Sequence, residues 1–367
     1  MNNILKFSVE NFLSIKNKTV LNLLSSNEKN LSEHIVNLKD DINVNSLQFF
    51  IGKTAVGKSN ILKAIYFLNF LIKIDADRRC NQEIPLLSFK GLENEPTSFE
   101  IMFNVNKSIF YYKLTLNKER ILKEKLLYLK NVKMAKIFDR EYIKEEDKYN
   151  YFYSRDFKDL KGLENKTLQN KLFLTSASQW SNNPKIRNVI TFLNNSLIYN
   201  KDYFIDNKLY LFENINKACF KEELLKLLSL GNNNIDNIEV KKVNEKIIVN
   251  IIYPNFKINI DEESSGFIHL FNLSILILNA IRDKKILIID NFDNNLHILL
   301  IKELINYILK KKIQSFISID KLSTLNLDWL RKDEIIIVDK KDGNTNIKNL
   351  AEVKNIYKSI NIEELIN

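Results

Sequence analysis

The sequence predicts an α/β fold in which both ends of the chain form one unit and a β and mostly helical lobe is inserted between them. Strand-like and helical patterns alternate in residues 1–130 and again in residues 236–367. Residues 131–235 are more polar and rich in Lys and Asn. Because 45% of the 367 residues are apolar, the chain can bury a large core, and we expect these three segments to be its divisions.

The first segment begins with strands and changes to a helix after residue 57. Apolar residues recur at helical spacing over residues 58–74, which predicts an amphipathic helix there. Alternating or continuous apolar residues predict strands at 4–12, 19–24, 46–51, 98–103, 110–116 and 125–129.

The last segment alternates between the two patterns. Its predicted strands cover 238–243, 246–252, 256–260, 285–290, 313–319 and 333–339, and its predicted helices cover 265–281 and 296–311. The strand at 285–290 is apolar at consecutive positions, which is typical of a strand buried on both faces.

Composition and charge limit the classes of function. The net charge of +10 is concentrated in residues 101–175, which hold 17 basic and 10 acidic residues. This segment could contact DNA, but 47 of the 55 basic residues are Lys, so a solvated Lys-rich face is the alternative. The two cysteines, Cys80 and Cys219, are too few for a disulfide framework. The longest apolar stretch, 269–281, is too short to cross a bilayer, so we expect a cytoplasmic protein with no membrane contact.

Residues 52–59 match the phosphate-loop pattern GxxxxGK[ST]. The glycine at each end of the loop lets successive backbone N–H groups turn inward onto phosphate oxygens. Lys58 brings a positive charge to the β- and γ-phosphates, and the Ser59 hydroxyl can bind Mg²⁺. The helix that follows directs its N-terminal dipole at the same anion. We therefore expect ATP to bind at Gly52, Lys53, Thr54, Ala55, Val56, Gly57, Lys58, Ser59 and Asn60.

Two further motifs lie in the last segment. Asp290 ends an apolar run and is expected at the carboxyl end of a neighbouring parallel strand, where it would complete the Mg²⁺ site with Ser59. The second motif, Asp-Glu-Glu-Ser-Ser-Gly at residues 261–266, precedes an apolar helix and ends 24 residues before Asp290.

These motifs resemble those of ABC-type ATPases of the SMC/RecF/OLD-like group, and are most similar to stand-alone bacterial ATPases of the AAA family. The resemblance begins with Ser8-Val-Glu-Asn-Phe-Leu-Ser-Ile15. It continues, in the family's order, at 57–65, 96–101, 172–174, 263–266 and 330–335. It implies an ABC/SMC-like ATPase head, with the phosphate loop in the N-terminal half and the signature and Walker B strand in the C-terminal half.

The resemblance also implies a sandwich dimer, in which ATP lies between the phosphate loop of one subunit and the signature of the other. Ser264 and Gly266 match the Ser and second Gly of the LSGGQ signature, and would donate hydrogen bonds to the γ-phosphate across the interface. A homodimer or a heterodimer with a homologue would both complete such a site. His297 falls where the family has its D-loop, and an interfacial role and a helix-start role both stay open.

Several positions depart from the family's pattern. The family's general base is a Glu after the Walker B Asp; here Asn291 cannot accept a proton, so a factor of about 10²–10⁴ in rate should be missing. Asp320 stands where the family has a switch His, and its carboxylate would repel phosphate. Thr54 and Val56 replace the family's Asn and Ser. We therefore assign no catalytic residue, with Asp293 a less favoured substitute base, and predict poor or absent hydrolysis.

Three functions fit these observations. The leading one is a nucleotide-dependent dimerisation switch or scaffold for a separate effector, a nuclease or toxin, in the anti-phage defence where stand-alone relatives occur. The sequence after Asp320 holds no DxD pair and no room for the TOPRIM nuclease domain of OLD proteins, so we expect the effector to be another protein. The second is an active RecF-like ATPase that contacts DNA through 101–175. The third is a structural pseudo-ATPase paired with an active homologue.

Overall fold

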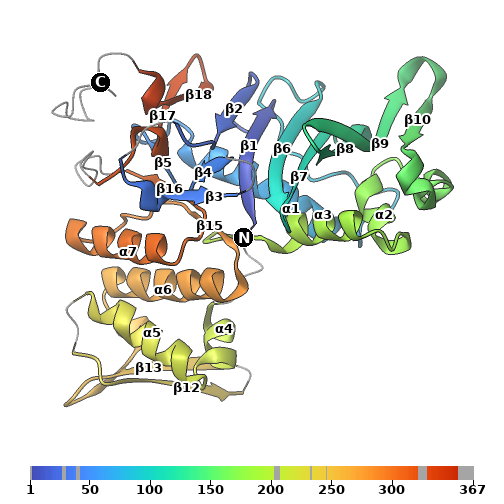
Figure 1. The fold of residues 1–367 in the computed structure, drawn as a ribbon. Coiled ribbons are helices and arrows are strands. Elements are labelled where there is room, and N and C mark those ends of the chain that lie inside the picture. Colours follow the sequence, from blue (N-terminus) through green and yellow to red (C-terminus); the bar gives the residue numbers. More distant parts are fainter. Residues whose placement is uncertain are drawn as a thin grey trace.

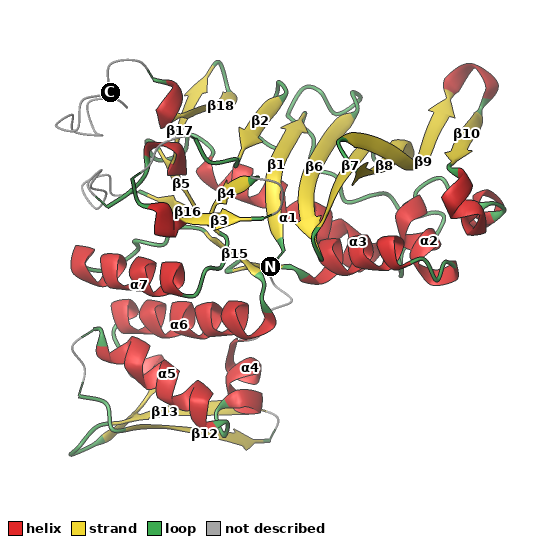
Figure 2. Cartoon of the chain, in the orientation of Figure 1, coloured by secondary structure: helices red, strands yellow, loops and turns green. Residues whose placement is uncertain are grey.

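The fold is a mixed α/β structure, as the sequence predicts. The computed structural model describes residues 2–26, 30–38, 42–201, 207–231, 234–244, 246–320 and 329–353. Figure 1 shows two large sheets at the centre and a smaller unit of helices and strands below them. In Figure 2 the same arrangement is coloured by helix and strand.

One large sheet carries the candidate site. In spatial order it contains β11 (Leu197–Tyr199), β15 (Ile286–Ile289), β16 (Ser315–Ile319), β5 (Leu47–Ile51), β17 (Ile335–Lys341) and β18 (Asn344–Asn349). The first five strands run parallel, and β18 pairs antiparallel with β17. The parallel arrangement brings the carboxyl ends of strands from distant parts of the chain to one edge.

Helices cover both faces of this sheet. α1 (Lys58–Asp75) packs on one face, in the core cluster that includes Phe50. α6 (Ser265–Asp283) and α7 (Ile298–Lys310) belong to the core on the other face, together with Phe49. Because adjacent residues of a strand point to opposite faces and both faces are covered, β5, β15 and β16 are buried along their whole length, and β15 is apolar at every position.

The second large sheet is antiparallel. In spatial order it contains β10 (Lys148–Tyr153), β9 (Lys133–Ile143), β8 (Ile121–Lys130), β7 (Ser108–Leu116), β6 (Thr97–Val105), β1 (Asn3–Glu10) and β2 (Thr19–Asn22). Residues 133–153, in the segment expected to be mostly helical, therefore extend this sheet as β9 and β10. The helices of that segment follow below the sheet, where α3 (Pro184–Asn195) lies beside α1 and α2 (Phe173–Trp180) packs on α3 (Figure 1).

The smaller unit lies on the far side of α6. It consists of α4 (Asn207–Asn214), α5 (Ala218–Ser229), β12 (Asn237–Val243), β13 (Lys246–Ile252) and β14 (Lys257–Asn259), and α5 packs on α6. A separate pair, β3 (Ile35–Asn37) and β4 (Asn43–Asn45), forms a two-stranded sheet. Among the described residues, only α6 has the length and mean hydropathy (1.3) to cross a membrane. Since 11 of its 19 residues are buried, it is the central helix of this core.

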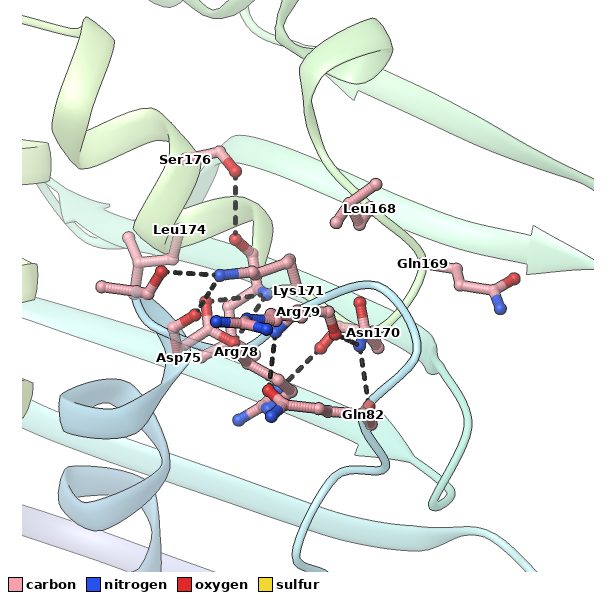
Figure 3. Close-up of polar contacts among 12 residues, drawn as sticks. Asp75, Arg78, Arg79, Gln82, Leu168, Gln169, Asn170, Lys171, Leu174 and Ser176 are labelled. Atoms are coloured by element: carbon pink, nitrogen blue, oxygen red, sulfur yellow. Dashed lines mark hydrogen bonds and ion pairs between the residues drawn. The ribbon is translucent and has the colours of Figure 1, made fainter.

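A buried polar cluster fixes the far end of the phosphate-loop helix α1 (Figure 3). Arg78 Nη1 donates to Asp75 Oδ1 at 3.0 Å and to the carbonyl of Asn170 at 2.6 Å. The backbone N–H of Leu172 donates to Asp75 Oδ2 at 3.2 Å, and the Asn170 amide donates to the carbonyl of Gln82 at 2.9 Å. Burial raises the pKa of Asp75, and the Arg78 charge opposes that effect. These contacts hold α1 against the segment that leads into α2.

Candidate nucleotide-binding site

The predicted phosphate loop connects β5 to α1, and its glycines are required by the local geometry. Gly57 has φ +112°, and a Cβ there would lie 2.1 Å from Thr345 Oγ1. Gly52 has φ +156°, and a Cβ there would lie 2.1 Å from the backbone oxygen of Val338. Both glycines therefore combine a backbone conformation that favours Gly with a lack of space for any side chain. A loop of this kind fits ATP, because its backbone can approach phosphate closely.

Lys58 is held at the mouth of this loop. Its side chain is only 5% exposed. Nζ donates to the carbonyl of Gly52 at 2.6 Å and to that of Lys53 at 3.0 Å. Nζ also pairs with Asp320 Oδ1 at 2.9 Å, although the Asp320 side chain is 41% exposed. The ammonium is therefore positioned by the loop, and its counter-ion is the residue predicted at the switch position.

Hydrogen bonds between hydroxyl groups support the phosphate loop, and the sequence does not predict them. Thr345 Oγ1, on β18, donates to the carbonyl of Val56 at 2.7 Å and lies 2.8 Å from Ser14 Oγ. The Asn60 side chain donates to the same Ser14 Oγ at 2.7 Å. Asn60 therefore supports the loop through Ser14. The only signal for Ser14 is its place in the opening motif, and Thr345 has none.

The neighbouring Asn11 explains another residue of that motif. Its side-chain amide donates to the carbonyls of Leu92 and Glu95 at 3.0 and 2.9 Å, and its oxygen accepts from the Phe89 N–H at 3.0 Å. Asn11 thus organises the loop before β6, while Phe12 is 1% exposed in the core. Within the motif, Ser14 reaches the phosphate loop and Asn11 shapes the surrounding fold.

We expect Thr345→Val to lower the free energy of unfolding by about 1–2 kcal/mol, because it leaves the Val56 carbonyl without its buried donor. Val nearly matches the shape of Thr, so little packing is lost. Thr19→Val is the control, since its hydroxyl bonds the Asn17 carbonyl at the surface and should change stability by less than about 0.5 kcal/mol. Urea unfolding of both variants measures the difference, and equal stabilities would contradict a bracing role.

Asp290 lies at the end of β15, but β15 is not the direct neighbour of the loop strand. β16 lies between β15 and β5, so the expectation of adjacent strands is wrong by one strand. Strand order depends on the crossovers, which local sequence does not encode. Ser318, at the end of the intervening β16, spans the gap and donates to Asp290 Oδ1 at 2.6 Å.

The carboxylate of Asp290 is fully buried and surrounded by donors. Besides Ser318, the Ser59 hydroxyl and the Lys201 ammonium bind it, with Lys201 on Oδ2. Burial raises the pKa of Asp290, but these three donors outweigh burial and hold the pKa below its usual value. Asp290 and Ser59 thus come together as predicted from the sequence. Their oxygen atoms suit Mg²⁺, yet the Lys201 ammonium occupies one carboxylate oxygen, so Mg²⁺ does not fit while Lys201 stays there.

The predicted base position is arranged by backbone contacts. Asn291 has φ +56°, and its N–H donates to Ser318 Oγ at 2.8 Å. Asp293 is 2% exposed, and each of its carboxylate oxygens lies 3.2 Å from the Asp320 N–H. Asp293 therefore orients residue 320, which argues against its use as a general base.

The signature residues lie at the start of α6. Ser264 caps this helix, its Oγ accepting from the Phe267 N–H at 3.2 Å. A Cβ on Gly266 would lie 2.9 Å from the Asn295 carbonyl, so the loop after β15 approaches the helix closely. His297 caps α7, its side chain accepting from the Leu299 N–H at 3.4 Å, which is the helix-start role left open above.

Several lysines of the basic segment 101–175 are paired within the antiparallel sheet. Lys123 lies 2.8 Å from Glu141, and Lys113 lies 3.0 Å from Glu100. Burial raises the pKa of Glu100, but contacts from Lys18 and Lys113 outweigh it and lower the pKa to about 2. These cross-strand pairs support the interpretation of a solvated Lys-rich face, while DNA contact stays a prediction.

Fold and site together define a phosphate-loop protein with the fold of SMC head domains. The Smc head domain with a coiled coil and joint from Pyrococcus yayanosii is 12% identical with a TM-score of 0.50, over 95% of this chain and 97% of that chain. The Smc head domain from Pyrococcus furiosus, bound to the C-terminal domain of ScpA, is 13% identical with a TM-score of 0.47, over 100% and 98%. The recombination mediator RecF is 14% identical with a TM-score of 0.41, over 94% and 98%.

The family described as "AAA domain, putative AbiEii toxin, Type IV TA system" matches residues 47–319, and the chain belongs to this family. The matched region runs from the phosphate-loop strand β5 to the end of β16, so it includes the loop, the signature and Asp290. No curated protein sequence matches the chain.

Proposed function

We propose that this protein is an ATP-binding head that hydrolyses ATP poorly or not at all and acts as a nucleotide-dependent dimerisation switch. The observation that carries the proposal is the Lys58–Asp320 ion pair of 2.9 Å. The ammonium that would bind phosphate is buried and well placed, whereas the residue at the switch position is an anion. ATP must displace that anion, so nucleotide binding and a change at residue 320 are coupled.

The dimer is supported by the different contacts that the predicted signature residues and Lys58 make. The hydrogen bond of Ser264 stays within its own helix, and Gly266 approaches Asn295. Lys58, in contrast, is bound to the loop carbonyls and Asp320. A second copy, or a homologue, would bring a signature helix N-terminus to this loop, where its N–H groups favour the γ-phosphate.

We further propose that the dimer acts on a separate effector, a nuclease or toxin, in the cytoplasm and in anti-phage defence. The family's description mentions a toxin and a Type IV TA system, which supports a role of this kind. The three-part division at residues 130 and 235 remains part of this proposal, with the first and last parts forming the head.

Sizing the purified protein with and without ATP, alongside a phosphate-release assay, tests this proposal. An ATP-dependent increase from monomer to dimer mass with little turnover is the expected result. A monomer under both conditions would contradict the switch, and turnover stimulated by DNA would favour the RecF-like alternative. A stable complex with a homologue, with no ATP-induced homodimer, would favour the structural pseudo-ATPase.

We expect Asp320→Asn to tighten ATP binding about three- to tenfold, because a partly exposed ion pair that competes with phosphate is worth about 1 kcal/mol. The control is Asp342→Asn, in the exposed turn between β17 and β18, where the left-handed φ of +51° suits Asn. Isothermal titration of ATP into both variants measures the effect. Unchanged affinity in Asp320→Asn would show that the carboxylate does not compete.

A further inference from the structure

Hydrogen bonds of the preceding residue, Asn200, hold the backbone at Lys201 close to Asp290. The Asn200 side chain makes two hydrogen bonds to the main chain of residue 290, accepting from its N–H at 2.9 Å and donating to its carbonyl at 2.9 Å. The Asn200 N–H also donates to the carbonyl of Ile288 at 3.1 Å. The chain at 200–201 is therefore fixed to the end of β15, within side-chain reach of Asp290.

The surroundings of Lys201 also favour this position. The residue lines an apolar cavity of about 300 Å³ together with Tyr66, Phe70 and Tyr199, whose side chains suit the aliphatic stem of a lysine. The Tyr199 ring is buried and lies 5.4 Å from that of Tyr66, centroid to centroid. Leaving Asp290 would take the ammonium away from a fully buried carboxylate, and a buried charge without its partner is unfavourable.

Lys201 stands where a divalent cation would otherwise neutralise Asp290. Ser318 donates to Oδ1 and Lys201 to Oδ2, while Ser59 donates to the same carboxylate. An ammonium has three N–H donors, so Lys201 can bind Asp290 and a phosphate oxygen together. A divalent cation at the same carboxylate would be repelled by the ammonium at close range.

We propose that Lys201 is a phosphate-binding residue that takes the place of Mg²⁺, so that the protein binds ATP without a divalent cation. The proposal rests on the ATP binding proposed above. Lys58 and Lys201 then supply two positive charges to the phosphates. In this proposal the oxygen ligands expected of a Mg²⁺ site at Ser59 and Asp290 are present, and the lysine takes the place of the cation.

The test is equilibrium binding of ATP by isothermal titration, in excess EDTA and in excess Mg²⁺. In the unmodified protein we expect the two dissociation constants to agree within about threefold. In Lys201→Gln we expect binding in EDTA to weaken at least about tenfold, as for the loss of a charge-assisted hydrogen bond. In Mg²⁺ the same variant should bind nearly as well as the parent, because the cation can now enter.

Two variants serve as controls. Lys201→Arg keeps the charge and should keep binding in EDTA within about threefold of the parent, since Arg also donates to both carboxylate and phosphate. Lys208→Gln removes a similarly exposed lysine that pairs with Asp261 at 2.9 Å, away from the loop, and should change neither constant.

The outcomes separate this inference from the function on which it rests. Binding by the unmodified protein in Mg²⁺ but not in EDTA would overturn the role of Lys201 and leave the proposed ATP binding intact. Equal loss of binding by Lys201→Gln in both conditions would also overturn cation replacement. If the unmodified protein bound ATP in neither condition, both proposals would fail.

Discussion

Lys58→Ala is expected to weaken ATP binding at least about 100-fold, the largest loss of affinity we expect from a single substitution. The Lys58 side chain is buried, and its Nζ donates hydrogen bonds to two loop carbonyls. The charge is therefore already oriented before ATP binds. Its removal deletes a charge-assisted contact to phosphate. It also leaves the carbonyls of Gly52 and Lys53 without this donor, and uncompensated carbonyl oxygens disfavour an anion nearby.

The matched control is Lys53→Ala in the same loop. The Lys53 side chain is exposed, and only its backbone carbonyl takes part in the site. We expect this variant to bind ATP within about threefold of the parent, as for the loss of one solvated surface charge. Isothermal titration gives both affinities, and thermal unfolding checks that each variant folds. If Lys58→Ala bound as well as the parent, the assignment of residues 52–60 to the nucleotide would be wrong.

The core of the fold could be predicted because its signals are local. The strands β5, β15 and β16 are mostly apolar, since both faces of their sheet are buried, and the loop motif marks the turn between β5 and α1. The class of fold follows from this alternation, and the comparison with a solved Smc head domain confirms it.

Strands whose exposed side is charged or polar could not be predicted in the same way. β9 places Asp139 between Lys125 and Lys136, at 2.8 and 3.1 Å, so its sequence is that of a solvated segment. β18 contains the polar run Asn344–Asn349, yet Thr345 is fully buried because its hydroxyl is bonded beneath the phosphate loop. Polarity in these strands reflects partners that are distant in sequence, and a local pattern cannot show them.

The residues of the candidate site likewise divide into those that a local sequence pattern marks and those that only the fold brings to the site. The sequence identifies Lys58, Ser59 and Asp290 because each belongs to a motif or ends an apolar run. Lys201 follows a strand of only three residues and meets Asp290 across 89 positions of sequence, so nothing nearby marks it. The residue that most changes the chemistry expected of the site is thus the one that only the folded chain reveals.

Restoring hydrolysis should require two substitutions. We expect the unmodified protein to release phosphate at less than about 1 s⁻¹, below the usual range of enzymes. Asn291→Glu alone should raise that rate by less than about tenfold, although a general base is worth about 10²–10⁴-fold when it is well placed. Asn291 has φ +56°, which Asn tolerates better than Glu, so backbone strain takes away part of the gain in every variant that carries this glutamate.

Charge gives the second reason. Asp290 and Asp293 flank residue 291 in the loop after β15, and Asp320 contacts Asp293, so a glutamate at 291 adds a fourth carboxylate to this group. Asp320→His removes one of these carboxylates and the ion pair with Lys58. It also introduces the His that the ATPases this sequence resembles have at the switch position. We therefore expect the double variant, Asn291→Glu with Asp320→His, to exceed the parent at least about 100-fold.

Phosphate release should be measured for the parent, both single variants and the double variant at saturating ATP. Saturation matters because Asp320→His is also expected to alter affinity, and only kcat reports the chemical step. A rate of Asn291→Glu equal to that of the double variant would show that Asp320 does not block hydrolysis. A parent rate above about 1 s⁻¹ would mean that another group acts as the general base. The buried Asp293 would then be the first residue to replace, although its replacement also removes the hydrogen bond that it accepts from the Asp320 N–H.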